Sequence, residues 1–251
     1  MKFVYQWVLF LLFVPQLALG FDHSYKEWGA FLKTHVSYSG LGSRVDYTLL
    51  RQHPAQLDLL LYNFSETPKK EFDQFSRDQQ IAFLINGYNA YSIKLVLERY
   101  PIYSFDESAP DSHSPYAKPF IALFDQKLSL DDLEHKWLMG KYEDLRVLFA
   151  VNCLCISCPN LAKQPYLASQ LDRQLERSIE LFLSDGFKNQ IRRHHLFLSE
   201  LIDLRERYFE LADGSIEPFF KKRWPKAAKL IAEGRFSYRK KDNALNDLLT
   251  P

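Results

Sequence analysis

The chain has 251 residues, of which 47% are hydrophobic and 25% are charged, and its formal net charge is +1. This is the composition of an ordinary globular protein, and the length is enough for one sizeable core. The basic residues are dispersed in short runs that form no track for phosphates, so no nucleic-acid partner is expected.

Residues 1–20 have the pattern of a secretory signal peptide. A lysine near the start precedes a short apolar stretch at residues 8–14, and Gly20 fits the small-residue rule for cleavage before Phe21. The apolar stretch is short for a membrane span. The sequence therefore predicts an exported protein, periplasmic or secreted, whose mature domain is residues 21–251. No stable membrane span is expected after cleavage.

The strongest predicted helix covers residues 77–99 and begins at a capping-box pattern, Ser76-Arg-Asp-Gln79. Apolar residues surround this helix almost completely, which is typical of a buried, central helix. Asn86 and Asn89 lie three residues apart on it. Because a buried amide without partners costs about 1–3 kcal/mol, both side chains must bond either to a neighbouring loop or within a site.

A second helix is predicted over residues 130–139, where Asp131 and His135 lie four residues apart on one face. Residues 145–151 form an apolar run with two valines and predict a buried strand that leads into the cysteine loop. A short strand is also expected at 120–124 and an amphipathic helix at 168–183. No repeat or long linker interrupts the pattern, so the sequence predicts a helix-rich α+β single domain with a small sheet.

All three cysteines lie in the loop Asn152-Cys-Leu-Cys-Ile-Ser-Cys158. Four interpretations are open: a nucleophilic thiol, a redox pair, a zinc site completed by a histidine such as His135, or a structural disulfide with one buried cysteine left over. Export favours the disulfide, because thiols oxidise outside the cytoplasm. The polar residues Asn152 and Ser157 beside the thiols favour a catalytic role for a thiol, because packing alone does not require them.

Three segments resemble the family called domain of unknown function 547. They are Gln80-Ile-Ala-Phe-Leu-Ile-Asn-Gly-Tyr-Asn-Ala90, Leu128-Ser-Leu-Asp-Asp-Leu-Glu-His135 and Phe149-Ala-Val-Asn-Cys-Leu-Cys-Ile-Ser-Cys-Pro159. The chain departs from the family at Cys155, because the family usually has a small residue at this position. The departure suggests that the Cys-x-x-Cys spacing of Cys155 and Cys158 is incidental to this chain.

The resemblance implies Cys153 as the characteristic cysteine, Glu134 and His135 as an acid–base pair, and Asn86 and Asn89 as their companions. It implies no activity. The favoured hypothesis is a cysteine-dependent hydrolase or acyl transferase.

In this hypothesis Cys153 is the nucleophile and His135 the base. Glu134, Asn86 or Asn152 orients the imidazole or stabilises an oxyanion, and Asn89, Ser157 and Cys158 support the site.

Two alternatives remain. One is a non-enzymatic binding module of the cell envelope that takes a peptide or glycan and is held by a structural disulfide. The other is a thiol redox or zinc site. The favoured hypothesis requires no cofactor.

Overall fold

A computed structural model describes residues 20–40, 42–104 and 114–249. The predicted signal peptide therefore lies outside the described residues, apart from Gly20. The helices of the first half are α1 (Lys26–His35), α2 (Tyr47–Gln52), α3 (Ala55–Ser65), α4 (Lys69–Phe72) and α5 (Arg77–Leu97). The helical segments that follow are η1 (Pro115–Ala117), η2 (Asp132–Met139), α6 (Gly140–Tyr142), η3 (Leu145–Phe149), η4 (Ala168–Gln170), α7 (Leu171–Ser184), α8 (Glu200–Asp203), α9 (Glu206–Asp213), α10 (Glu217–Arg223) and α11 (Pro225–Ala232).

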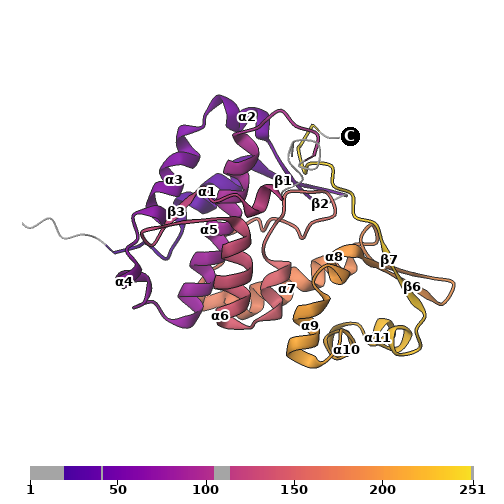
Figure 1. Ribbon diagram of the computed structural model, residues 1–251. Coiled ribbons are helices and arrows are strands. Elements are labelled where there is room, and N and C mark those ends of the chain that lie inside the picture. Colours follow the sequence, from indigo (N-terminus) through magenta and orange to yellow (C-terminus); the bar gives the residue numbers. More distant parts are fainter. Residues whose placement is uncertain (1–19, 41, 105–113, 250–251) are drawn as a thin grey trace, which may run out of the picture.

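The central helix is confirmed as α5, which runs through the middle of the N-terminal half (Figure 1). Its capping box is complete: the Gln79 N–H donates to the Ser76 hydroxyl at 3.3 Å, and the Ser76 N–H donates to the Gln79 side chain at 2.9 Å. Helices α2 and α3 and the segments η2 and η4 pack around it. Both Asn86 and Asn89 are almost completely buried, as a helix apolar on all sides requires.

The strands form small separate sheets. They are β1 (Val36–Ser39), β2 (Gly42–Val45), β3 (Ile121–Leu123), β4 (Gln126–Leu128), β5 (Gln190–Arg192), β6 (His195–Ser199) and β7 (Phe236–Arg239). Strands β1 and β2 form one antiparallel hairpin and β3 and β4 another. In the third sheet β6 pairs antiparallel with β5 and parallel with β7. The helix-rich α+β class is confirmed, although the described residues form three small sheets where a single small sheet was expected.

The strand predicted over 145–151 is wrong. Residues Leu145–Phe149 form the 3₁₀ helix η3, and a turn follows before the cysteines. The Asp144 side chain accepts the Arg146 N–H at 3.1 Å and begins the helix, and the Ala150 N–H closes it on the Val147 carbonyl at 2.9 Å. The apolar run arises because residues 147–151 are buried on every side, and complete burial gives the same pattern in a strand and in a short helix.

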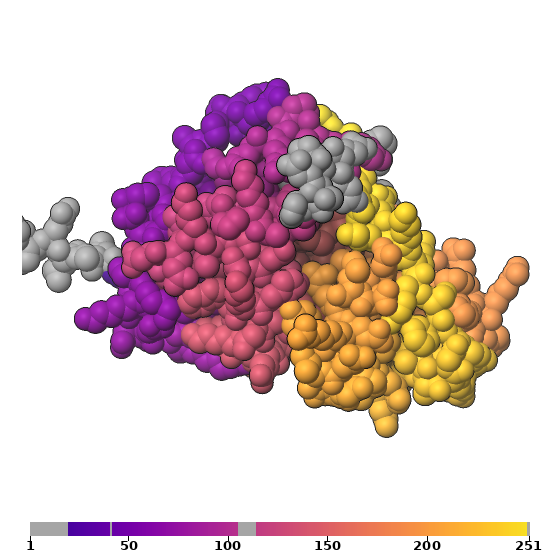
Figure 2. Space-filling model, in the orientation of Figure 1, coloured from indigo at the N-terminus to yellow at the C-terminus, as the bar shows by residue number. Residues whose placement is uncertain are grey.

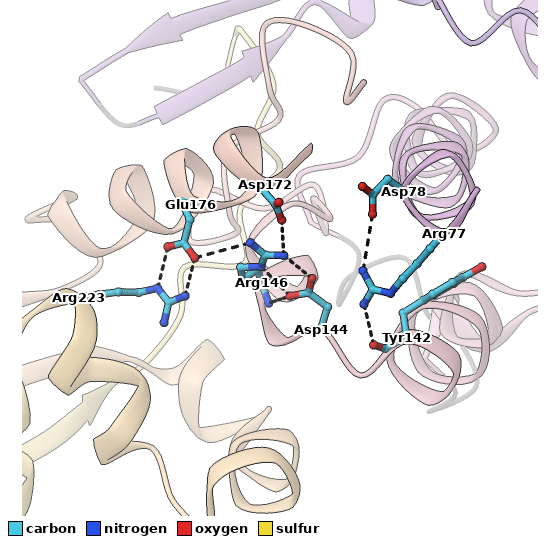
Figure 3. A network of polar contacts seen from close by, with 8 residues as sticks. All are labelled: Arg77, Asp78, Tyr142, Asp144, Arg146, Asp172, Glu176 and Arg223. Carbon is cyan, nitrogen blue, oxygen red and sulfur yellow. Dashed lines mark hydrogen bonds and ion pairs between the residues drawn. The ribbon is translucent and has the colours of Figure 1, made fainter. Parts of the chain in front are cut away.

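A chain of ion pairs fixes η3 to the helices behind it (Figure 3). The Arg146 guanidinium lies 2.8 Å from carboxylate oxygens of both Asp144 and Asp172, the latter on α7. Glu176, one turn further along α7, pairs with Arg223 of α10 at 2.8 Å. The segment that leads into the cysteine loop is therefore anchored to two elements that are distant in sequence.

The C-terminal segment returns to the N-terminal half and lies along the cysteine loop (Figure 1). The Asn246 N–H donates to the Leu154 carbonyl at 2.9 Å, and the Ile156 N–H donates to the Ala244 carbonyl at 2.9 Å. The Val45 N–H at the end of β2 donates to the Asn246 carbonyl at 2.8 Å. The cysteine loop is thus held between β2 and the last residues of the chain. Within the described ranges, no helix is both long and apolar enough to cross a membrane.

Candidate functional site

The three cysteine sulfurs converge, each within 4.8 Å of the others. The Cys158 sulfur is in direct contact with those of both Cys153 and Cys155. The Cα atoms of Cys153 and Cys158 are 5.6 Å apart, and those of Cys155 and Cys158 are 5.0 Å apart, so both Cα separations lie in the range that a disulfide spans. Because one sulfur forms a single S–S bond, the two bridges are alternatives that share Cys158.

The three thiols differ in their access to solvent. Cys153 is half-buried, whereas Cys155 is 8% exposed and Cys158 is 2% exposed. The Cys155 N–H donates to the Cys158 sulfur at 3.0 Å, a bond that stabilises negative charge on that sulfur. The resemblance suggested that the Cys-x-x-Cys spacing made by Cys155 is incidental. In the structure, however, Cys155 contacts the Cys158 sulfur.

The backbone between the first two cysteines is strained. Leu154 has a φ of 64°, in the left-handed region, which costs a residue with a side chain roughly 1–2 kcal/mol. Its N–H donates to the Asn152 side chain at 2.7 Å, and its carbonyl accepts the bond from Asn246 described above. The Asn152 amide also donates to the Pro159 carbonyl on the far side of the loop. Asn152 therefore closes the cysteine loop and maintains its strained turn.

The two amides of α5 hold backbone segments in place. The Asn89 amide donates to the Ala150 carbonyl at 3.0 Å, and its side-chain oxygen accepts the Asn152 N–H at 2.9 Å. Asn86 makes the corresponding pair of bonds with the backbone of Tyr166, at 2.8 and 3.0 Å. Each amide thus holds a backbone segment, and among the described residues neither has a hydrogen bond to an imidazole.

Ser157 has a similar role at the other end of the loop. Its hydroxyl accepts the Asp242 N–H at 2.7 Å, and its own N–H donates to the Asp242 carbonyl at 3.3 Å. The side chain is 5% exposed. Ser157 thus joins the cysteine loop to the C-terminal segment.

Cys153 opens into a cleft of about 370 Å³. Figure 2 shows a recess where the magenta, orange and yellow surfaces meet, and the cleft is lined from these three parts of the chain. The lining includes Tyr116, Asp131, His135, Cys153, Arg205 and Lys241. The predicted pair Cys153 and His135 therefore shares one cleft, although helix η2 and the cysteine loop are separate in sequence.

Glu134 and His135 diverge within this cleft. The buried Glu134 carboxylate pairs with Arg205 at 2.8 Å and accepts the Tyr88 hydroxyl at 3.3 Å. His135 is exposed, and its Nδ1 lies 2.5 Å from the Tyr208 hydroxyl. Tyr208, and not Glu134, orients the imidazole.

Asp131 lies four residues before His135 and lines the same cleft. Burial raises the pKa of the Asp131 carboxyl above its ordinary value, and the nearby His135 opposes this rise. The four-residue spacing of Asp131 and His135 was visible in the sequence. Arg205 and Tyr208 had no such signal, because they come from the segment around α9, which only the tertiary structure brings to η2.

The cysteine cluster could also hold a soft metal ion. Thiolates are preferred by Cu(I) and Zn(II), and three of them lie within reach of one ion here. In the described part of the chain no other group of three histidine, cysteine or acidic side chains converges in this way. A four-coordinate zinc site would need a further ligand in addition to the three sulfurs.

Comparison with known proteins confirms the family resemblance. Residues 72–183 match the family model described as "Protein of unknown function, DUF547". The match contains α5, η2 and all three cysteines, and it ends before α8, α9 and the C-terminal segment that complete the cleft. No curated protein and no solved structure shows significant similarity to the chain.

Proposed function

Residues 72–183 form a DUF547 domain, and from this premise we propose that its cysteine cluster is a centre of thiol–disulfide exchange. The observation that carries the proposal is the contact between Cys158 and Cys153. Their Cα atoms are 5.6 Å apart, and Cys153 opens to the cleft while Cys158 is buried. Such a pair has one sulfur that can meet a substrate and one that can resolve the product.

The exchange proceeds in two balanced steps. In the reduced chain the Cys153 thiolate attacks a substrate disulfide, so that a mixed disulfide forms and one substrate sulfur leaves as a thiolate. The Cys158 thiolate then attacks the Cys153 sulfur and displaces the second substrate thiolate. The substrate gains two electrons and the protein retains the Cys153–Cys158 disulfide. The reverse sequence oxidises a substrate dithiol.

His135 supports the proposal as a proton carrier. The thiolate is the reactive form of cysteine, and an imidazole beside it lowers the thiol pKa. Tyr208 contacts Nδ1 of His135, which leaves Nε2 to exchange a proton with groups in the cleft that it shares with Cys153. His135→Gln is expected to slow the reaction of Cys153 with disulfides.

The test uses residues 21–251 in glutathione buffers, with the disulfide content read by mass spectrometry. An exchange centre has a reduction potential above about −300 mV, whereas a structural disulfide resists reduction below that value. Oxidised glutathione should form a mixed disulfide with Cys153 that accumulates in Cys158→Ser and is absent from Cys153→Ser. A bridge that stays oxidised in the folded protein, with no adduct, would overturn the proposal in favour of an envelope binding module for a peptide or glycan.

A second candidate is the cysteine-dependent hydrolase or acyl transferase, favoured by the position of Cys153 and His135 in one cleft. Here the free Cys153 thiolate attacks an acyl carbonyl and His135 takes the thiol proton. An acylating probe should then label Cys153 under reducing conditions and release its leaving group. Labelling by a disulfide probe but not by the acylating probe favours exchange.

We further propose that the protein is exported, to the periplasm or the medium. The predicted signal peptide at residues 1–20 supports this location, and a cysteine cluster that forms disulfides suits an oxidising compartment. N-terminal sequencing of the protein recovered from cell fractions tests it. A start at Phe21 in the exported fraction is the expected result.

A further inference from the structure

Cys155 has the same relation to Cys158 as Cys153 has. Its Cα atom is 5.0 Å from that of Cys158, a separation that a disulfide spans, and the two sulfurs are in direct contact. Cys158, at 2% exposure, is thus a central residue with one half-buried partner, Cys153, and one buried partner, Cys155, and both partners line the cleft. A two-cysteine exchange centre does not require the inner partner.

We propose that Cys155 completes a relay that moves the disulfide inward, from Cys153–Cys158 to Cys155–Cys158. The inference rests on the exchange function proposed above. The Cys155 thiolate attacks the Cys158 sulfur, an S–S bond forms between them, and the bond between Cys158 and Cys153 breaks. The electron pair leaves on the Cys153 sulfur, which takes a proton from His135 or water. The chain keeps one disulfide throughout.

The backbone around the cluster is suited to this step. The Leu154 carbonyl and the Ile156 N–H are both bonded to the C-terminal segment, and the Cys158 N–H donates to the Cys155 carbonyl at 3.1 Å. These bonds join backbone groups only. The one bond to a cysteine side chain in this set is the bond that the Cys155 backbone N–H donates to the Cys158 sulfur. The sulfurs can therefore exchange partners by rotating their side chains, while the main chain remains fixed.

The burial of the three sulfurs gives the relay a direction. The inner pair is shielded, since Cys155 and Cys158 are 8% and 2% exposed, whereas Cys153 is half-buried. Both Cys153 and Cys155 line the cleft, and Cys153 is the more accessible of the two. After the relay, the oxidised chain carries a nucleophilic thiol in the cleft that His135 also lines. This thiol can attack a disulfide-bonded polypeptide and leave again without net change in oxidation, which is disulfide rearrangement. The substrate class is therefore a polypeptide with exchangeable disulfides.

The position of the free thiol in the oxidised chain tests the relay. Residues 21–251 are oxidised to one disulfide, confirmed by the loss of two hydrogen atoms in the intact mass, and the folded protein is treated with N-ethylmaleimide. Peptide mapping should find the label on Cys153 and a bridge between Cys155 and Cys158. Cys155→Ser should form the Cys153–Cys158 bridge and take no label.

The two proposals fail differently. A free thiol found only at Cys155, after unfolding and labelling of the oxidised chain, would overturn the relay and leave exchange at Cys153 intact. Failure of Cys155→Ser to exchange with glutathione at Cys153 would instead overturn the proposed function. Near-ultraviolet circular dichroism of each variant establishes that it is folded, and Cys155→Ala replaces Cys155→Ser if the serine variant is not.

Discussion

The side-chain oxygen of Asn89 accepts a 2.9 Å hydrogen bond from the backbone N–H of Asn152, the residue immediately before Cys153. The Asn89 amide also donates to the Ala150 carbonyl, so one side chain of the central helix fixes two peptide groups at the entrance to the cysteine loop. The geometry of the three sulfurs therefore depends on a buried amide that touches none of them.

Asn89→Ala should lower the free energy of unfolding by about 1–3 kcal/mol, because two buried backbone groups lose their partner. It should also accelerate alkylation of the reduced Cys153, since the loop that bears it is released. Urea denaturation and labelling kinetics measure the two effects. Asn86→Ala is the matched control: it should cost comparable stability through Tyr166 and leave the labelling rate unchanged. Equal acceleration in both variants would contradict a specific role for Asn89.

The ion pair of the buried Glu134 with the half-buried Arg205 predicts a large effect of removing one charge. Glu134→Gln should destabilise the protein by about 3 kcal/mol, because the Arg205 guanidinium, largely shielded from water, loses its counter-charge. The double variant Glu134→Met with Arg205→Leu should recover most of this loss. Glu180→Gln, which breaks an exposed pair with Arg177, should cost less than about 1 kcal/mol. Thermal unfolding of the four proteins provides the comparison.

The adjacent residues Asp131 and Asp132 should respond to pH with opposite signs. Burial raises the pKa of Asp131 above 3.8, so the folded state retains a proton that the unfolded state has lost, and stability falls as the pH rises through the raised value. Bonds from Lys136 and Ser129 lower the pKa of Asp132, so its contribution is present above pH 3.8 and is lost as the pH falls through the lowered value.

At neutral pH, Asp131→Asn should therefore raise the melting temperature and Asp132→Asn should lower it. Both differences should decrease towards acidic pH, where the carboxyls are protonated in the folded and the unfolded state alike. Melting curves between pH 3 and pH 8, a range chosen to span the ordinary carboxyl pKa of about 3.9, would record the effect. The same sign for both variants would show that ionisation of Asp131 does not oppose folding.

The contact between Phe21 and Glu71 predicts an effect of signal cleavage. The Phe21 backbone nitrogen lies 2.5 Å from the Glu71 carboxylate, and its ring packs edge-on against Phe83 at 4.8 Å between centroids. Cleavage after Gly20 would make this nitrogen an ammonium group.

A chain that begins at Phe21 should then be about 1 kcal/mol more stable with a free amine than when acetylated, because the ion pair at this half-buried site is partly screened. Glu71→Gln should abolish the difference, whereas Glu66→Gln, at an exposed position nearby, should preserve it. Chemical denaturation of the acetylated and free forms measures the effect. No dependence on acetylation would exclude a role for the amine.

Local sequence patterns were sufficient to predict those helices that are determined by interactions between residues close in sequence. The capping box at Ser76 and the continuous apolar surface after it predicted α5 and its burial, because both depend on residues within one helical turn. The resemblance also predicted Cys153 and His135 as site residues; the two line one cleft, and their roles stay a prediction. The strand predicted at 145–151 was wrong, because an unbroken apolar run reports burial and does not distinguish a strand from a buried 3₁₀ helix.

The sequence by itself determined the helix-rich α+β class, the central helix and the clustering of three thiols in one short loop. Only the tertiary structure decided which groups the thiols meet. Cys158 is shared between Cys153 and Cys155 because the loop is folded back by Asn152 and held by the C-terminal segment. Tyr208 and Arg205 reach η2 from about seventy residues away. Contacts of this kind are made by the packing of distant elements, and no periodicity or spacing along the chain encodes them.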